Sequence, residues 1–195
     1  MKKLLILLAL SFSVSFSQLR ETVKFNNGMF WGEYSEVKEQ PLWVEYKIYK
    51  PHSNSSREGM DFYKDDIIKT SDNEDYKGNE WDKGHLAPAA TFGETELRMR
   101  ATFTYLNSAL QHQDLNRGEW RFLEDAERDW AQEETLTVRI VVEFKKKATK
   151  LTSGATIPHG FHRHIYFHKK KSKECYFFLN EKPSKKWKEY KIKCK

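Results

Sequence analysis

The sequence contains little glycine, proline or cysteine, with 9, 5 and 2 of these residues among 195. This scarcity excludes a collagen-like or low-complexity chain, and the 14% of aromatic residues indicates a folded core rather than disorder. The longest mainly apolar run, residues 4–16, has thirteen residues, whereas a membrane-spanning helix needs roughly 20, so an integral membrane protein is excluded. Internal repeats and linker-like segments are also missing, and the length suits one domain.

The N-terminus has the pattern of a secretory signal peptide. Two lysines precede the apolar run, and Ser15-Phe16-Ser17 places small residues around a cleavage point before Gln18. We therefore expect residues 1–17 to be removed, and residues 18–195 to form a single domain that is secreted or periplasmic and not attached to a membrane. The alternatives are an uncleaved membrane anchor and a buried N-terminal helix.

The positive charge is concentrated at the C-terminus. Residues 168–195 contain eleven lysines and three glutamates, a net charge of +8, whereas residues 18–167 have a net charge of −4. Aromatic residues are interleaved with these lysines, and this basic tail would suit a polyanion such as nucleic acid. The spacing favours a plainer interpretation, in which the tail is a lysine-rich edge hairpin whose aromatic side chains face inward.

Both cysteines, Cys175 and Cys194, lie in this tail. An exported protein enters an oxidising compartment, so we expect one disulfide that closes an 18-residue interval, with a stabilisation of about 3 kcal/mol. A metal site built on two cysteines is less well supported, because further ligands at the usual spacings are missing nearby.

Hydrophobic periodicity predicts an α+β protein with one long helix set against antiparallel strands. Apolar residues recur at helical spacing over residues 114–132, and we expect a helix there, weakened slightly by Gly118. Alternating or β-branched segments predict strands. These segments are residues 43–49, 102–106, 136–144, 164–167 and 175–179.

Two segments carry candidate chemistry. His85 follows Gly84 in a polar stretch and could act as a general base near neutral pH, although a lone loop histidine is more often structural. Asn116, Trp120 and Glu124 are spaced i, i+4 and i+8, which on a helix places an amide and a carboxylate along one face. Such oxygen ligands suit Mg²⁺, but the same pattern fits a solvated polar helix face.

The sequence resembles a known family at these two segments. Asp82-Lys83-Gly84-His85 followed by Leu-Ala-Pro-Ala resembles the DRGH signature of the DNA/RNA non-specific endonucleases. The downstream pattern of that family also has counterparts here: Asn107, Gln111, Asn116, Gly118, Trp120 and Glu124. Flanking segments at residues 42–46 and 157–161 agree, so the resemblance covers residues 29–166.

This resemblance implies a ββα-metal core, in which a long metal-bearing helix packs on an antiparallel sheet. It implies that His85 is the general base that activates water, and that Asn116 is the one direct protein ligand of Mg²⁺, with Mn²⁺ as a second candidate ion. Glu124 would hold water at the ion, and Asn107 would orient the site. The implied activity is hydrolysis of DNA and RNA to products with 5′-phosphate ends.

The sequence departs from the family signature at Lys83, where the family has arginine. Lys83 keeps a positive charge for the scissile phosphate but lacks the planar, bidentate guanidinium. Arg57 is a candidate for a second phosphate contact, and Asp82 is expected to fix the turn. An alternative function follows from Lys83: a catalytically weak nucleic-acid-binding protein with a decayed site.

His159, His162 and His164 form a rival candidate metal site. Closely spaced histidines can bind Zn²⁺, and His162 and His164 would share one face of a strand. A fourth ligand is not defined by the sequence, so the zinc hydrolase that this site would imply ranks behind the endonuclease.

Overall fold

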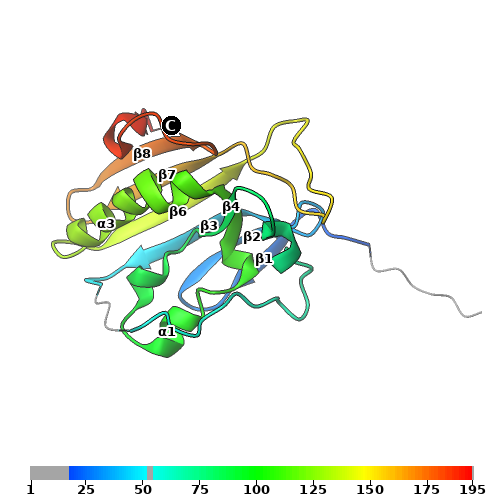
Figure 1. Cartoon of the computed structure of the whole chain (residues 1–195). Helices are drawn as coiled ribbons and strands as arrows, with labels where there is room; N and C mark the ends of the chain where they lie inside the picture. Colours follow the sequence, from blue (N-terminus) through cyan, green and yellow to red (C-terminus); the bar gives the residue numbers. More distant parts are fainter. Residues whose placement is uncertain (1–17, 52–54, 195) are drawn as a thin grey trace, which may run out of the picture.

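A computed structural model describes residues 18–51 and 55–194. The predicted signal peptide, residues 1–17, lies outside the described residues. Within the described residues, seven strands form an antiparallel sheet in the order β1-β2-β3-β6-β7-β8-β9 (Figure 1). Its strands are β1 (Val23–Asn26), β2 (Phe30–Ser35), β3 (Gln40–Ile48), β6 (Leu136–Glu143), β7 (Gly160–Phe167), β8 (Ser172–Leu179) and β9 (Lys191–Ile192).

The long connection between β3 and β6 holds a smaller unit. There, β4 (Trp81–His85) pairs antiparallel with β5 (Ser108–His112), and a helical segment follows directly. This segment consists of α2 (Gln113–Leu115), the π-helical η4 (Asn116–Trp120) and α3 (Arg121–Trp130). The remaining helices are α1 (Glu96–Arg100) and the 3₁₀ turns η1 (Asn73–Tyr76), η2 (Ala89–Phe92), η3 (Tyr105–Asn107) and η5 (Trp187–Tyr190). Among the described residues, no helix is both long and apolar enough to cross a membrane.

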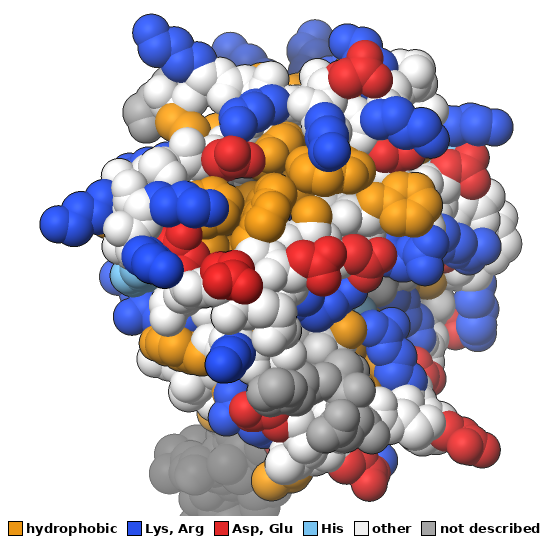
Figure 2. Space-filling view, turned by 90° about the vertical axis from the view of Figure 1, so that its left-hand side faces the viewer, with side chains coloured by type: hydrophobic (Ala, Val, Ile, Leu, Met, Phe, Trp, Pro, Cys, Tyr) orange, Lys and Arg blue, Asp and Glu red, His pale blue; other side chains and the backbone are white. Residues whose placement is uncertain are grey.

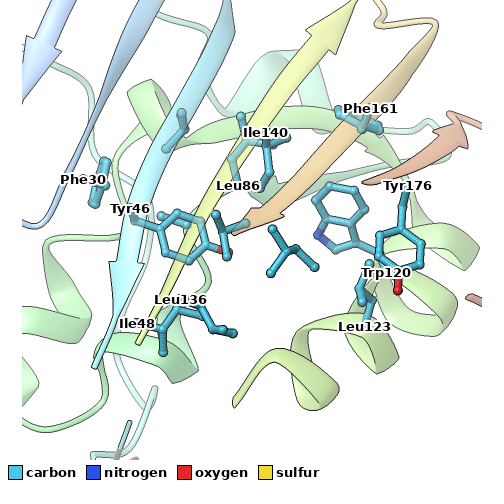
Figure 3. Packing of buried hydrophobic residues seen from close by; sticks show 14 of the residues in the cluster. Phe30, Tyr46, Ile48, Leu86, Trp120, Leu123, Leu136, Ile140, Phe161 and Tyr176 are labelled. Carbon is cyan, nitrogen blue, oxygen red and sulfur yellow. The ribbon is translucent and has the colours of Figure 1, made fainter. Parts of the chain in front are cut away.

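The core lies between the sheet and the helical segment. Strand β6 alternates strictly between buried and half-buried residues, as expected for a strand with one face on a core. Trp120 and Leu123 from the helical segment lie near Tyr176 and opposite Ile140 and Phe161 of the sheet (Figure 3). Each fully buried side chain of this kind contributes about 2 kcal/mol, so this contact fixes the helices to the sheet.

The predictions for the main sheet are confirmed, and one predicted strand is wrong. Residues 136–144, 164–167 and 175–179 correspond to β6, β7 and β8. Residues 102–106, expected as a strand, instead enter the 3₁₀ turn η3. The reason is local hydrogen bonding: the Thr104 hydroxyl accepts from the Leu106 N–H (3.3 Å), and Asn107 donates its side-chain amide to the Thr102 carbonyl (3.0 Å). These bonds turn the chain before it extends again as β5.

The expected continuous helix over residues 114–132 is also wrong in detail. The helical segment changes to π-helical geometry at η4, where the backbone of Gly118 leaves the helical region (φ −110°, ψ −112°). Because this break rotates the segments against each other, Trp120 does not share a face with Asn116 and Glu124. It is fully buried against Phe161 and Phe178.

The C-terminal tail has the structure that the plainer interpretation predicts, with most of its aromatic side chains packed inward. Tyr176 and Phe178 of β8 are buried, and Tyr190 stacks on Phe178 with ring centroids 4.6 Å apart. Trp187 packs edge-on against Trp130 of α3 at 5.9 Å. These aromatic side chains therefore belong to the packing between the tail and α3.

Charges of both signs are dispersed over the end of the molecule nearest the viewer in Figure 2. Lysine and arginine side chains surround a central hydrophobic area there, with acidic side chains interspersed among them. The excess of lysine therefore does not form one continuous basic stripe on this face.

The tail is fixed at two points. The predicted disulfide is present, joining Cys175 of β8 to Cys194 with a Cα–Cα distance of 5.3 Å. Further back, the carboxylate of Glu119 in η4 accepts from the backbone N–H of Trp187 (2.7 Å). The tail is thus attached both to the sheet edge and to the helical segment.

Removing the disulfide should destabilise the protein. We expect the variant Cys175→Ala/Cys194→Ser to lose about 3 kcal/mol of unfolding free energy, because its unfolded chain is no longer cross-linked. Urea unfolding measures this, with Lys193→Ser, an exposed change beside Cys194, as the control. Equal stability of the double variant and the wild type would contradict the expectation.

Candidate active site

A cleft of about 550 Å³ lies between the end of β4, the helical segment and the loop that carries Arg57. Its charged and polar lining residues are Arg57, His85, Asn116, Arg117, Arg121, Glu124, Asp125 and Arg128. Arg117 and Arg128 are paired with Asp82 and Asp125, whereas Arg57 and Arg121 form no ion pair among the described residues, so the cleft keeps a positive balance. Arginine is suited to phosphate because its guanidinium can donate two parallel hydrogen bonds. The cleft therefore suits a phosphate-bearing ligand.

His85 is the last residue of β4 and reaches the cleft. It follows Gly84, where a side chain would collide with Gln111 of β5, because a Cβ there would lie 2.5 Å from the Gln111 Cβ. The imidazole lies between the rings of Phe62 and Phe103, each with its centroid 4.7 Å away. The absence of a side chain at Gly84 thus lets β4 and β5 pair closely and fixes the direction of His85.

The environment of His85 keeps its imidazole neutral. Burial between the aromatic rings, together with the positive charge of Arg57, lowers the pKa of His85 to about 3. Its Nε2 is buried and has no hydrogen-bond partner in the described part of the chain. The imidazole is therefore neutral at pH 7 with one ring nitrogen unused, which is the state a general base must start from, although so low a pKa also makes it a weaker proton acceptor than free imidazole.

Asn107 holds the backbone just after His85. Its fully buried amide donates to the carbonyls of Ala87 (2.9 Å) and Thr102 (3.0 Å), and its Oδ1 accepts from the Ala87 N–H (2.8 Å). With both amide hydrogens and the oxygen in use, Asn107 does not line the cleft. It supports the site from below by fixing the segment that follows His85.

Asn116 is oriented by Asp82, a contact that the sequence did not predict. The Nδ2 of Asn116 donates to Asp82 Oδ2 (2.9 Å), and the same carboxylate accepts from Arg117 Nε (2.8 Å) and Nη2 (2.6 Å). Asp82, expected to fix its own turn, therefore ties β4 to η4. The Oδ1 of Asn116 has no hydrogen bond among the described residues and can serve as a ligand, so the site fits a hard cation with water in its other positions.

Glu124 lines the same cleft from α3. Its side chain is 13% exposed, and burial raises its pKa to about 7, an effect opposed by the nearby guanidinium of Arg163. Arg163 Nη1 lies 3.7 Å from Glu124 Oε1. A carboxylate and an amide oxygen thus face one electropositive cleft.

The two predicted substrate residues lie in different places. Arg57 lines the cleft, whereas Lys83 does not. The Nζ of Lys83 donates to Asp61 Oδ1 (2.8 Å) and lies 5.5 Å from the ring centroid of Phe62, the same ring that packs on His85. The structure thus gathers Arg57, His85, Asn116 and Glu124, and leaves Lys83 to one side.

Three arginines of the cleft were missed at the level of the sequence. Arg117, Arg121 and Arg128 line the cleft from η4 and α3. Their spacings of four and seven residues are helical, so this pattern could have indicated a basic helix face. It was obscured because acidic residues alternate with them along the same segment.

The histidines considered for zinc do not assemble a metal site. His162 Nε2 lies 2.7 Å from Glu143 Oε2, and the rings of His162 and His164 are 6.2 Å apart. Within residues 18–51 and 55–194, no three histidine, cysteine or acidic side chains are grouped so that they could hold a metal ion. The zinc interpretation therefore has no support from this part of the chain.

The paired strands β4 and β5, with the helical segment after them, form the ββα-metal arrangement. A solved structure of an EndoG/EndoGI complex has the same fold, with a TM-score of 0.77 and 19% identity over 91% of this chain and 82% of that chain. The chain belongs to the DNA/RNA non-specific endonuclease family, whose model matches residues 11–195.

Curated relatives match part of the chain. "Endonuclease G, mitochondrial" of Bos taurus is 34% identical over 93 residues, which is 45% of this chain and 31% of the relative. "Nuclease EXOG, mitochondrial" of Homo sapiens is 33% identical over 96 residues, 47% of this chain and 26% of the relative. The matched segments thus span less than a third of the length of these curated relatives.

The neutral state of His85 should make stability depend on pH. In the unfolded chain this imidazole takes up a proton below about pH 6.5, whereas in the native state it does so only near pH 3. The unfolding free energy is therefore unaffected by His85 above pH 6.5 and decreases as the pH falls below that value, because only the unfolded state is stabilised by the proton. When the pH is lowered from 7.5 to 5, the unfolding free energy of the wild type should decrease by about 2 kcal/mol more than that of His85→Gln.

Urea unfolding in EDTA at the two pH values measures this difference. His168→Gln, which removes an exposed histidine, is the matched control and should follow the wild type. Equal losses in the wild type and His85→Gln would show that the imidazole is not held neutral.

Proposed function

We propose that this protein is a divalent-metal-dependent endonuclease that hydrolyses phosphodiester bonds in DNA and RNA. The observation that carries the proposal is one electropositive cleft in which His85, with an Nε2 that has no hydrogen-bond partner among the described residues, shares space with Asn116 and Glu124. Membership of the endonuclease family supports it. Phosphodiester hydrolysis requires a base, a positioned water and positive charge beside the phosphate, and the residues of this cleft can meet all three needs.

In the proposed reaction His85 accepts a proton at Nε2 from the attacking water. Asn116 Oδ1 would hold the ion, Mg²⁺ with Mn²⁺ as the alternative, and Glu124 would accept hydrogen bonds from water around it. When bound, the ion supplies positive charge to the phosphate and the leaving oxygen. Asn107 and Asp82 keep His85 and Asn116 in place through the hydrogen bonds described above.

Substrate recognition would depend on the phosphate backbone. Arg57 and the three arginines of η4 and α3 present guanidinium groups to the cleft, and such contacts position a nucleic acid without reading its sequence. For Lys83 we propose a supporting role, because Asp61 neutralises it and its side chain lies over Phe62, which contacts His85. Low sequence preference and activity on both DNA and RNA follow.

Replacing His85 should abolish cleavage. We expect His85→Ala to cut supercoiled plasmid and single-stranded RNA at least about 10²-fold more slowly than the wild type, because the proton acceptor is lost. Cleavage of both substrates by the wild type should require Mg²⁺ and stop in EDTA. The matched control His168→Ala changes an exposed histidine outside the cleft and should be fully active.

Two results would overturn parts of this proposal. Full activity of His85→Ala would remove His85 as the base. Salt-sensitive nucleic-acid binding by a wild type that cleaves nothing with Mg²⁺ or Mn²⁺ would favour the binding protein suggested by Lys83, and Lys83→Arg would then be the variant to assay for activity.

We also propose that the protein is exported and that the mature chain begins near Gln18. The order of the basic, apolar and small-residue regions supports this, as does the disulfide, because such bonds persist in oxidising compartments. Residues 1–17 fused to a reporter should direct it out of the cytoplasm of a bacterial host, with cleavage before Gln18 seen by N-terminal sequencing. A charged substitution in the apolar run, Leu7→Arg, should block export. If the reporter fused to the unchanged residues 1–17 stays in the cytoplasm, the proposal is contradicted.

A further inference from the structure

A buried ion pair lies directly beneath the cleft. Arg163 of β7 is fully buried, and its guanidinium forms a two-pronged contact with Glu127 of α3, from Nε to Oε1 (2.5 Å) and from Nη2 to Oε2 (2.6 Å). Nη2 also donates to the hydroxyl of Tyr46 on β3 (2.9 Å). The guanidinium carbon lies 4.5 Å from the ring centroid of Trp120, so hydrogen bonds and packing together prevent the group from rotating.

One nitrogen of this guanidinium, Nη1, takes no part in these hydrogen bonds. Nη1 of Arg163 is buried and has no hydrogen-bond partner in the described part of the chain. It lies 3.7 Å from Oε1 of Glu124, which is within ion-pair distance but too long for a hydrogen bond. An unpaired buried N–H is costly, so its placement beside Glu124 calls for a physical reason.

We propose that Arg163 is a positioning residue for Glu124: its guanidinium, fixed in the core beside this side chain, favours the ionised form of Glu124 at the cleft, and Glu127 limits how much of the positive charge acts there. The inference rests on the proposed function for the role of Glu124 at the ion. Glu127 and Glu124 are one helical turn apart, so the same helix carries both the partner of Arg163 and the group that Arg163 acts on.

The other charges around Glu124 act with smaller effect. Burial favours the neutral carboxyl and raises the pKa of Glu124, Arg163 opposes this most strongly, and Glu127 reinforces it. Arg128 on α3 and Arg57 from the opposite loop add weaker opposition. The remaining charged or titratable side chains of the cleft are His85, Arg117, Arg121 and Asp125.

The test is a direct titration of Glu124 in protein freed of metal with EDTA. Carboxyl ¹³C NMR of protein labelled on glutamate follows each side chain, and Glu124→Gln identifies the signal. The double variant Arg163→Met/Glu127→Met removes the pair without leaving a lone buried charge, a replacement that proteins often tolerate. We expect its Glu124 midpoint to rise by about one pH unit or more.

A second variant should move the midpoint the opposite way. In Glu127→Gln, Arg163 keeps its charge but loses the negative partner, so the Glu124 midpoint should fall. Tyr46→Phe is the matched control, because it removes a hydrogen bond from the same guanidinium without changing any charge. It should lower stability and leave the midpoint unchanged.

A purely structural role for Arg163 predicts that these variants change stability alone. An unchanged Glu124 midpoint in the folded double variant overturns the proposal, and so does an unchanged or raised midpoint in Glu127→Gln, which decides the matter if the double variant does not fold. The titration uses neither nucleic acid nor ion, so a failure of the proposed nuclease activity would leave its result intact. If the protein does cleave nucleic acid, the acidic limb of its pH profile should shift with the midpoint.

Discussion

The placement of α3 depends on the buried pair between Arg163 and Glu127. Moving two charges from water into a protein core is unfavourable unless geometry and further hydrogen bonds compensate, and here the two-pronged contact and the Tyr46 hydroxyl provide that compensation. Together with the packing of Trp120 and Leu123 on the sheet, these contacts orient α3 over β7 and β3. Because Glu124 lies one turn before Glu127, the same constraint directs Glu124 to the cleft.

Polar contacts hold the backbone after His85 and the side chain of Asn116, while packing between Phe62 and Phe103 holds the ring of His85. Asn107 uses its whole amide on the backbone after His85, and Asp82 joins Asn116 to the strand that carries His85. Hydrogen bonds of this kind fix direction as well as distance, whereas apolar contacts tolerate sliding. His85 and Asn116 are thus positioned by supporting residues that do not themselves line the cleft.

The C-terminal tail supports the same helical segment from another side. Trp187 packs on α3 and its backbone N–H is bound by Glu119 in η4, while the disulfide from Cys175 to Cys194 holds the end of the tail to β8. Since η4 also carries Asn116, the tail and the cleft share one structural element. The basic tail thus contributes to the fold through its aromatic residues and the disulfide.

The sequence by itself determined β3, β6, β7 and β8 of the main sheet, the disulfide and the family, because alternation, cysteine count and short motifs are local signals; β1, β2 and β9 were not predicted. Only the tertiary structure decided that the helix breaks at Gly118, that Lys83 turns to Asp61, and that Arg163 is buried. Alternation along β7 places Arg163 on the same face as Phe161 and Ile165, the face that packs on the core, but the pattern does not show what balances its charge. Its partner lies 36 residues away, and whether a charge can be buried depends on such distant partners, which no local pattern specifies.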